Sequence, residues 1–208
     1  MKKSILFFIC LLCATFTFAQ EKKGSVGIGY MRPNCYYPSL DLNGVYLGFD
    51  YNVPIAKNFG VAPGLYYSCS AKNRKLNSLD MIVSQYVGIP CNFFYSADIS
   101  QNTRVNVFAG PTLSYGMSLL EIEKIHRYGE IKYETTDLYA HYGGWGGYYG
   151  VPTGYQRLFL MIGGGVSFDF SNTVRFTLGY DYGIIRRRSK YYSPYYRNFP
   201  HVGVSYLF

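Results

Sequence analysis

The residue types that could carry redox or metal chemistry are few, and their spacing argues against both. Cys10 and Cys13 form a C-x-x-C pair, a spacing typical of thiol redox sites, but both lie in an apolar run that we expect to be removed from the mature protein. The other cysteines and the histidines show no metal-ligand spacing. They are Cys35, Cys69, Cys91, His126, His141 and His201. We therefore expect no metal site and no cofactor.

Acid–base and nucleophilic chemistry is also poorly represented. Asp137 and His141 are four residues apart, which is the one pairing that could begin a catalytic triad. The sequence contains no G-x-S-x-G nucleophile elbow, and no third triad member can be identified. We therefore expect a protein that is not an enzyme.

A cluster of cations interleaved with tyrosines is the strongest candidate for a binding site. Arg and Lys donate charge-assisted hydrogen bonds to anions, and Tyr rings offer flat faces for stacking. The cluster can also be a solvated rim that merely extends the hairpin, and the sequence leaves both interpretations open. Its members are Arg186, Arg187, Arg188, Lys190, Tyr191, Tyr192 and, further along, Arg197.

The first residues predict an export signal. Lys2 and Lys3 precede an apolar run that ends in small residues, which is the pattern of a secretory signal peptide. We expect this signal to span residues 1–19, with Thr17 three residues before the cleavage point, cleavage after Ala19 and a mature domain over 20–208. Without the two lysines the formal charge falls from +8 to +6.

The rest of the chain alternates large apolar residues with small or polar ones, the period of a β-strand whose two faces meet different surroundings. Aromatic residues make up 19% of the chain and charged residues only 15%, a balance unusual for a soluble enzyme. Between residues 44 and 53, for example, Val45, Leu47 and Phe49 share one face, and Tyr46 and Asp50 share the other. Eight such segments are expected, near 24–32, 44–53, 59–69, 82–95, 103–116, 157–170, 174–183 and 199–208.

The links between these segments alternate in length. Short links are expected at 54–58, 96–102 and 171–173, and long ones at 33–43, 70–81, 117–156 and 184–198. Most segments have about the 9–11 residues that a tilted strand needs to cross a bilayer. Short turns on one side and long loops on the other are typical of a transmembrane β-barrel. Within the third long link, residues 121–134 could form a hairpin above the membrane, because Lys124 and His126 would be unfavourable in lipid; a ten-stranded barrel is therefore rejected.

The third short turn predicts a register. If Phe170 pairs with Val174, then Phe168 faces Phe176 on the lipid side and Asp169 faces Arg175 inside. Apolar matching and charge pairing select the same register, and a slip of one residue would break both. Val166 would then face Leu178 on the lipid side.

The predicted interior is polar and plugged. An eight-stranded barrel encloses roughly the space that its own side chains fill. Its many inward glycines are offset by bulky Tyr46, Tyr66, Phe94, Phe108 and Phe159. The ionisable inward residues predict a charge network, interpreted mainly as structural and alternatively as an ion path. These residues are Asp50, Arg104, Asp169, Arg175 and Asp181.

The C-terminal residues HVGVSYLF resemble the signal that the outer-membrane barrel assembly machinery reads. Phe208 is the terminal aromatic, and Val202, Val204 and Tyr206 alternate before it. Together with IPCNFFY, VFAGPTLSYG and LMIGGGVSFDF, they make residues 24–208 similar to the small outer membrane protein beta-barrel domain family, often labelled porin-like. The resemblance implies an all-β fold, an eight-stranded antiparallel barrel in the outer membrane, and no shared catalytic residues.

Outer-loop residues then become candidates for surface contacts. On this topology the basic cluster faces away from the cell, which excludes nucleic acid and favours anionic glycans or lipopolysaccharide phosphates. Trp145, in the segment GGWGGYYG, belongs either to an adaptable binding surface or to an aromatic belt at the headgroup level. Cys35 and Cys69 lie near the outer rim, and both a disulfide and two free thiols remain open, whereas Cys91 points to lipid.

Two functions are consistent with these features. The first is a structural or surface-interaction barrel, in contact with lipid, lipopolysaccharide and an extracellular glycan or protein ligand. The second is a narrow porin-like channel or an accessory barrel for secretion or transport. The fold alone does not decide between them.

Overall fold

The protein is described from a computed structural model, which covers residues 24–35, 40–75, 78–127, 130–137, 157–184 and 197–208. The predicted signal segment lies outside these residues. No helix among the residues covered is long and apolar enough to cross a membrane.

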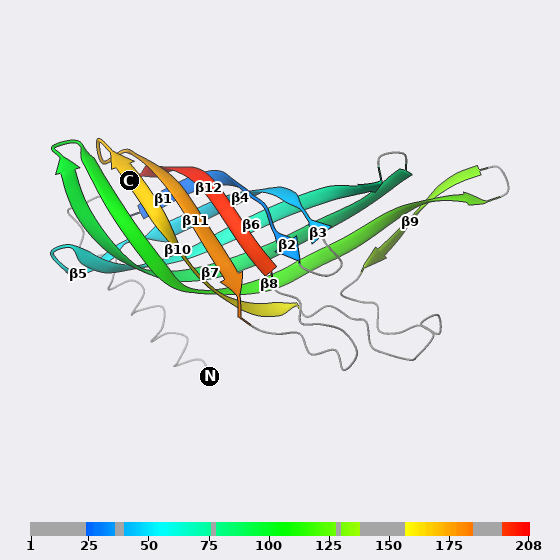
Figure 1. Cartoon of the computed structure of the whole chain (residues 1–208), viewed down its shortest axis with the longest axis horizontal. Helices are drawn as coiled ribbons and strands as arrows, with labels where there is room; N and C mark the ends of the chain where they lie inside the picture. Colours follow the sequence, from blue (N-terminus) through cyan, green and yellow to red (C-terminus); the bar gives the residue numbers. More distant parts are fainter. Residues whose placement is uncertain (1–23, 36–39, 76–77, 128–129, 138–156, 185–196) are drawn as a thin grey trace, which may run out of the picture.

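Eight long antiparallel strands close into a barrel (Figure 1). Each pairs with its neighbour in the chain, and the last pairs with the first from Ser25 opposite Leu207 to Met31 opposite His201. The seam also carries reciprocal backbone hydrogen bonds between Gly24 and Phe208, of 3.0 and 2.9 Å. The barrel strands are β1 (Gly24–Met31), β4 (Asn43–Tyr51), β6 (Phe59–Lys75), β7 (Ser78–Ser100), β8 (Thr103–Arg127), β10 (Leu158–Phe170), β11 (Val174–Gly183) and β12 (Arg197–Leu207).

Four further strands lie at the two ends of the barrel. β5 (Val53–Ala56) pairs with the start of β6 at the short-turn end. β2 (Asn34–Cys35) and β3 (Leu40–Asp41) lie within the first long link, and β9 (Glu130–Asp137) pairs with β8. The expected eight-stranded barrel is confirmed, and the pairing of Leu120–Arg127 with Glu130–Asp137 agrees with the hairpin expected over 121–134.

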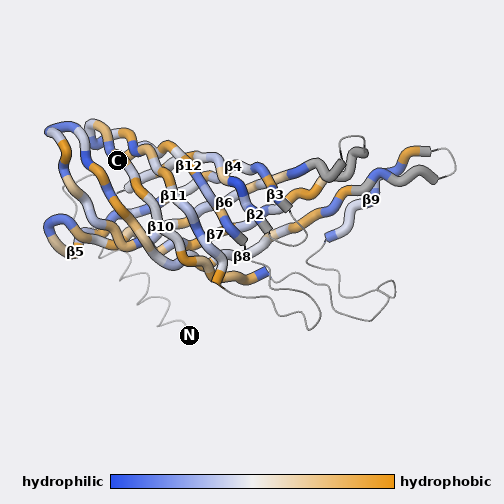
Figure 2. The backbone as a smooth tube through the Cα atoms, viewed as in Figure 1, coloured by the Kyte–Doolittle hydropathy of each residue, from blue (hydrophilic) through white to orange (hydrophobic). Residues whose placement is uncertain are grey.

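The outer surface of the barrel is apolar, whereas the inner surface carries both polar and apolar side chains. Figure 2 shows apolar and polar residues alternating along the strands. Ile28, Val45 and Leu178 are 67%, 63% and 65% exposed, although a soluble protein would bury such side chains. The buried side chains include polar ones: Ser25, Ser68, Ser70, Ser84, Asn106, Thr112, Ser114 and Ser167. This inverted pattern fits a sheet whose outer face contacts lipid.

The turn between β10 and β11 confirms the predicted register. Phe170 is opposite Val174, Phe168 opposite Phe176, and Asp169 opposite Arg175. Ser171 and Asn172 both have positive φ, 51° and 50°, and the Thr173 amide donates to the Phe170 carbonyl at 3.0 Å. Positive φ at two consecutive turn residues is the geometry that matches strand twist in a tight hairpin.

Several predicted links are strands instead. The link 96–102 shortens to the two-residue turn Gln101–Asn102, because β7 continues to Ser100. At the long-loop end, β6, β7 and β8 continue well past β11, β12 and β1, so that they and β9 form a sheet that protrudes from one side of the barrel (Figure 1). We call this part the protruding sheet. It consists of β6 and β7 beyond the barrel, β8 from Gly116 onward, and β9.

A β-bulge marks the point where the protruding sheet leaves the barrel. Gln85 is opposite Ser118 but Tyr86 is opposite Gly116, so Met117 is the extra residue. A bulge of this kind strengthens the local twist and bends the strand. The guanidinium of Arg157 donates to the Met117 carbonyl at 2.8 Å and forms an ion pair with Asp137 at 3.6 Å. Arg157 thereby connects the start of β10 to both β8 and the end of β9.

Inward glycines make room for inward aromatic rings. A Cβ atom at Gly88 would collide with the Tyr66 ring, and one at Gly29 or Gly203 would collide with Tyr46. Gly60 faces Phe94 in the same way. Gly48 is different, because its nearest neighbour would be the Tyr66 Cβ at an ordinary 3.5 Å. The predicted offset of glycines by bulky residues is therefore confirmed at these positions.

This packing predicts opposite outcomes for two glycine substitutions. Gly88→Val forces Tyr66 to move, and we expect it to reduce the free energy of unfolding by about 1–3 kcal/mol, as overpacking does. Gly48→Ala, the matched control, should change it by less than about 0.5 kcal/mol. Urea unfolding of the refolded barrel in lipid vesicles, followed by tyrosine fluorescence, measures both. Equal stability of the two variants would contradict the packing argument.

Candidate functional site

The outer half of the lumen is closed by an apolar cluster. Met31, Tyr86, Phe159, Met161 and Phe199 pack together and are almost fully buried. Tyr86 and Phe199 meet edge to face with ring centroids 5.5 Å apart, and Phe159 stacks on Phe199 at 6.0 Å. We call these five residues the plug. The lumen is filled here, as expected, but the expectation of a polar interior is wrong at this level, because the side chains that fill it are large and mostly apolar.

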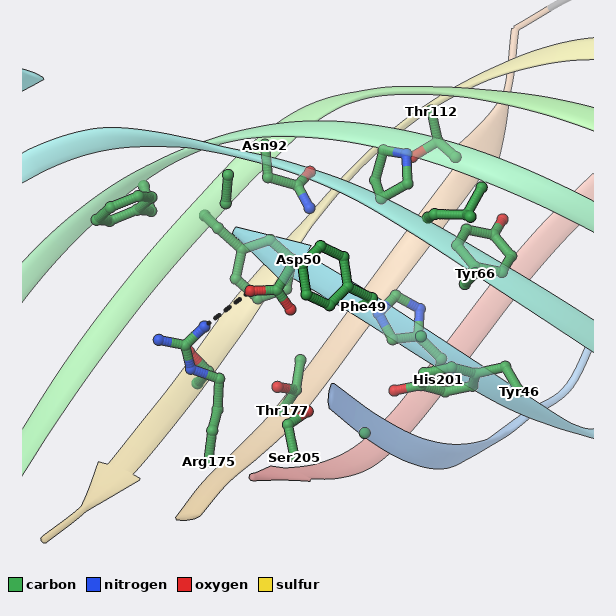
Figure 3. Close-up of a pocket in the computed structure, with 18 of the residues that line it drawn as sticks. Tyr46, Phe49, Asp50, Tyr66, Asn92, Thr112, Arg175, Thr177, His201 and Ser205 are labelled. Atoms are coloured by element: carbon green, nitrogen blue, oxygen red, sulfur yellow. Dashed lines mark hydrogen bonds and ion pairs between the residues drawn. The ribbon is translucent and has the colours of Figure 1, made fainter. Parts of the chain in front are cut away.

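Arg175 organises the charges near the short-turn end. Its Nε and Nη2 donate to the two carboxylate oxygens of Asp169 at 2.7 and 3.0 Å. Its Nη1 donates to Asp50 at 3.4 Å (Figure 3). The Arg175 and Asp169 side chains are 12% and 6% exposed, so this bidentate pair is largely removed from solvent.

Neutral polar groups complete the hydrogen bonding of the two carboxylates. The Ser25 hydroxyl donates to Asp50 at 2.6 Å. The Asn106 amide donates to Asp169 at 3.0 Å, and its oxygen accepts from Ser96 at 2.6 Å. The sequence argument did not single out these residues. Their inward parity, in the same ring of the barrel as the charges, was the signal that could have identified them.

The other two predicted network residues lie elsewhere. Arg104 pairs with Asp98 at 2.7 Å at the rim, where both side chains are exposed. Asp181 lies nearer the plug, and its one ion pair among the described residues is with His201, 3.9 Å from the ring Nδ1. The five predicted charges therefore form three separate groups, because their strands place them at different heights in the barrel.

A cavity of about 140 Å³ lies between the plug and Arg175. Tyr46, Tyr66 and His201 line one side, and Asp50 lies in its wall (Figure 3). Tyr46 meets Tyr66 edge to face at 6.4 Å and His201 at 6.0 Å. The remaining lining includes Phe94, Phe108, Asn92, Thr112, Thr177, Asp181 and Ser205. We call this space the luminal cavity.

A second, larger space lies next to the luminal cavity, toward the short-turn end. It measures about 350 Å³, and Lys57 and Arg104 stand at its rim. Asn52, Phe94, Asn106 and Arg175 line both spaces. We call it the vestibule. Because short turns of outer-membrane barrels lie in the periplasm, the vestibule opens there, whereas the plug faces outward.

The remaining candidate residues fall into two groups. Val202, Val204, Tyr206 and Phe208 face outward and are 48%, 43%, 53% and 52% exposed. Outside the described residues lie Trp145, Arg186, Arg187, Arg188, Lys190, Tyr191 and Tyr192. Cys69 is a free cysteine, so the alternative of a disulfide with Cys35 is wrong; Cys69 is opposite Val45 on the outward face of the wall.

The structure gives no support to a metal centre or to the one acid–base pairing in the sequence. Within the described ranges, no group of three or more His, Cys, Asp or Glu residues could hold a metal ion. Asp137 forms its ion pair with Arg157, and His141 lies outside the described part of the chain.

Comparisons with known proteins agree with the fold. No protein-family model matches the sequence, and no curated protein matches it. The structure is similar to that of Ail, the attachment invasion locus protein of Yersinia pestis, with a TM-score of 0.50 and 12% identity over 91% of this chain and 100% of Ail.

Two further solved structures are more distant. Neisserial surface protein A gives a TM-score of 0.47 at 12% identity, over 89% of this chain and 96% of its own. The outer membrane enzyme PagL gives 0.46 at 6% identity, over 86% and 97%. At such identities a likeness shows the fold alone, so the absence of enzymatic activity stays a prediction. With its closed wall and apolar exterior, the chain has the fold of the small eight-stranded outer-membrane β-barrels.

Proposed function

We propose that this protein is a structural or surface-interaction barrel of the outer membrane and not a channel. The plug is the observation that carries the proposal. Three aromatic side chains and two methionines fill the lumen at the outward end, and Met161 is 0% exposed. An ion crossing here would have to leave water and pass apolar side chains, which is costly.

The protruding sheet supports a role at the cell surface. It raises β8 and β9 beyond the barrel, and Arg157 ties its base to β10. On β9 the side chains of Ile131 and Tyr133 are 52% and 58% exposed. A sheet that projects beyond the barrel presents a surface to a partner, whereas a purely structural barrel has no need of one.

The basic cluster supplies the chemistry of contact in this proposal. Residues 184–196 link β11 to β12 at the same end of the barrel as the protruding sheet, and together with Arg197, the first residue of β12, they carry five cationic side chains. Guanidinium groups bind sulfate, phosphate and carboxylate groups bidentately. The proposed ligand is therefore an anionic glycan or the phosphate groups of lipopolysaccharide.

The C-terminal strand has a proposed role in biogenesis. Val202, Val204 and Tyr206 on β12 and Phe208 directly after it form one outward row, and β12 is the strand that closes the barrel against β1. Before closure the backbone edge of β12 is also unpaired, so a row of side chains on this strand can be read together with a free strand edge.

Neutralising the basic cluster should weaken glycan binding. We expect Arg186→Gln, Arg187→Gln and Arg188→Gln together to lower the salt concentration at which the detergent-solubilised protein elutes from an immobilised sulfated glycan. The reason is the loss of charge-assisted hydrogen bonds. Lys57→Gln with Arg104→Gln removes charges at the opposite end and serves as the control. Elution of the triple variant at the wild-type salt concentration would contradict the basic-cluster proposal.

The plug predicts the electrical behaviour of the barrel. In planar bilayers the wild-type protein should carry no steady current at low voltage, while Phe159→Ala with Phe199→Ala, which removes the two stacked rings of the plug, should carry a measurable one. Phe93→Ala with Phe176→Ala makes the same change on the lipid-facing surface, where both side chains are 48% exposed, and should stay silent. A steady wild-type current would support the channel alternative instead.

The Arg175 group is proposed to be structural. Arg175→Met leaves Asp50 and Asp169 without their cation, and we expect a loss of about 3–5 kcal/mol in the free energy of unfolding, because an uncompensated buried charge is costly. Arg104→Met breaks an exposed ion pair and should cost less than about 1 kcal/mol. Urea titration in vesicles compares the two. Similar small losses in both variants would argue against a structural role.

A further inference from the structure

The lumen contains more negative than positive charge. Among the described residues that line the luminal cavity, Asp50 and Asp181 are acidic, Arg175 is basic and His201 is the one imidazole. Arg175 also pairs with Asp169, so a single guanidinium serves two carboxylates. Asp181 is left as a third carboxylate within the same barrel. Isolated negative charge inside a membrane-embedded wall is unfavourable, and a cation placed near it would be stabilised.

Asp181 is the carboxylate that lacks a strong partner. No described residue donates a hydrogen bond to it, and His201 lies at 3.9 Å, beyond hydrogen-bonding distance. The His201 Nδ1 is instead 3.2 Å from the Phe199 carbonyl, to which it can donate. The Asp181 side chain is only 16% exposed. Its unmet acceptor capacity therefore borders the luminal cavity and not bulk solvent.

The remaining wall of the luminal cavity suits an organic cation better than a metal ion. Tyr46 and Tyr66 meet edge to face, and Phe94 and Phe108 add further rings to the lining. Ring faces attract cations, and quaternary ammonium groups are the ligands that aromatic cages bind. A metal ion would need several oxygen or nitrogen ligands converging on one point, and the described residues provide no such group.

Size and access limit the ligand further. A cavity of about 150 Å³ holds a molecule the size of benzene, and the luminal cavity measures about 140 Å³. The ligand is thus a small one, of roughly six or seven non-hydrogen atoms. It reaches the luminal cavity from the periplasm, through the vestibule, because the plug closes the other end.

We propose that the luminal cavity binds a small organic ammonium ion from the periplasm, with its positive charge beside Asp181 and its methyl or methylene groups against Tyr46 and Tyr66. This site is independent of the outer surface proposed above for glycan contact. Its ligand is charged oppositely to the anions that the basic cluster would bind.

Titration with choline tests the proposal. Choline has a size that fits the luminal cavity, and neohexyl alcohol, in which carbon replaces the ammonium nitrogen, has the same shape without the charge. With the full-length mature barrel in detergent micelles, we expect saturable choline binding by isothermal titration calorimetry. The neutral alcohol should bind at least about tenfold more weakly, since the charge interaction with Asp181 is lost.

Three variants locate the site. Asp181→Asn keeps the shape of the side chain and should weaken choline binding at least about tenfold, whereas Asp98→Asn removes the same charge at the exposed rim and should leave it unchanged. Gly48→Leu places a side chain into the luminal cavity without a backbone clash and should abolish binding. The shift in gel migration between unheated and boiled samples confirms that each variant is folded.

The outcomes are decisive in both directions. Wild-type binding that Asp181→Asn and Gly48→Leu both reduce supports the site. No choline binding by the wild type, equal binding of neohexyl alcohol, or full binding by Asp181→Asn would overturn it. If Asp181→Asn does not fold, Gly48→Leu decides, because unchanged choline binding in that variant places the cation elsewhere. Loss of choline binding would leave retention on the sulfated glycan unaffected, so the two proposals fail separately.

Discussion

The whole architecture depends on one constraint: in hydrocarbon, every backbone N–H and C=O must find its partner within the chain. A sheet satisfies this requirement only when its edges meet, and here β1 and β12 meet along seven residue pairs and two flanking hydrogen bonds at Gly24 and Phe208. Closure fixes which face of every strand points outward. The apolar exterior, the packed lumen and the position of each charge follow from it.

Closure with only eight strands also creates a packing problem in the lumen. The space is too narrow for large side chains on every strand at the same height, so large and absent side chains must alternate between neighbours. Tyr46 occupies the space left by Gly29 and Gly203, and Tyr66 occupies that left by Gly88. Glycine in a strand normally weakens it, but here the backbone is held by closure, and the missing side chain is what lets the rings fit.

Sequence reasoning predicted the strands inside the membrane, where closure of the sheet in lipid dictates the residue pattern. It failed for the segments beyond the membrane, where that constraint does not apply. Alternation identified every barrel strand, and the match of Asp169 with Arg175 predicted a register that the structure confirms. Beyond the membrane no lipid enforces alternation, so the extensions of β6 and β7 were mistaken for a loop, and β8 was expected to end at residue 116 although its later part was foreseen as a hairpin. The prediction that all five charged residues form one network failed for another reason. Parity tells which face a residue is on but not its height, so Arg104 and Asp181 were assigned to one network with Arg175.

The charged residues are distributed unevenly along the barrel axis, so the two ends of the lumen differ in polarity. Going inward from the outer surface, one meets apolar side chains at Tyr86 and Phe199, then Asp181 with His201, then Arg175 with its two carboxylates, and last the exposed Arg104 pair. Polar and charged side chains become more frequent toward the periplasm, and the Arg104 pair at the rim is the most exposed of the three charged groups. A charged side chain is destabilised least where water or a hydrogen-bonding partner can reach it. Accordingly, the exposed Arg104–Asp98 pair lies at the periplasmic rim, and the Arg175 group, which makes the most hydrogen bonds, lies next to it farther from the rim. Asp181 is the exception, because it lies farthest from the periplasmic rim and yet has the weakest partner, His201 at 3.9 Å. The burial of the Asp181 carboxylate is unfavourable and no hydrogen bond from the described residues offsets it. A bound organic cation would supply the missing partner, and this accounts for a carboxylate at this position.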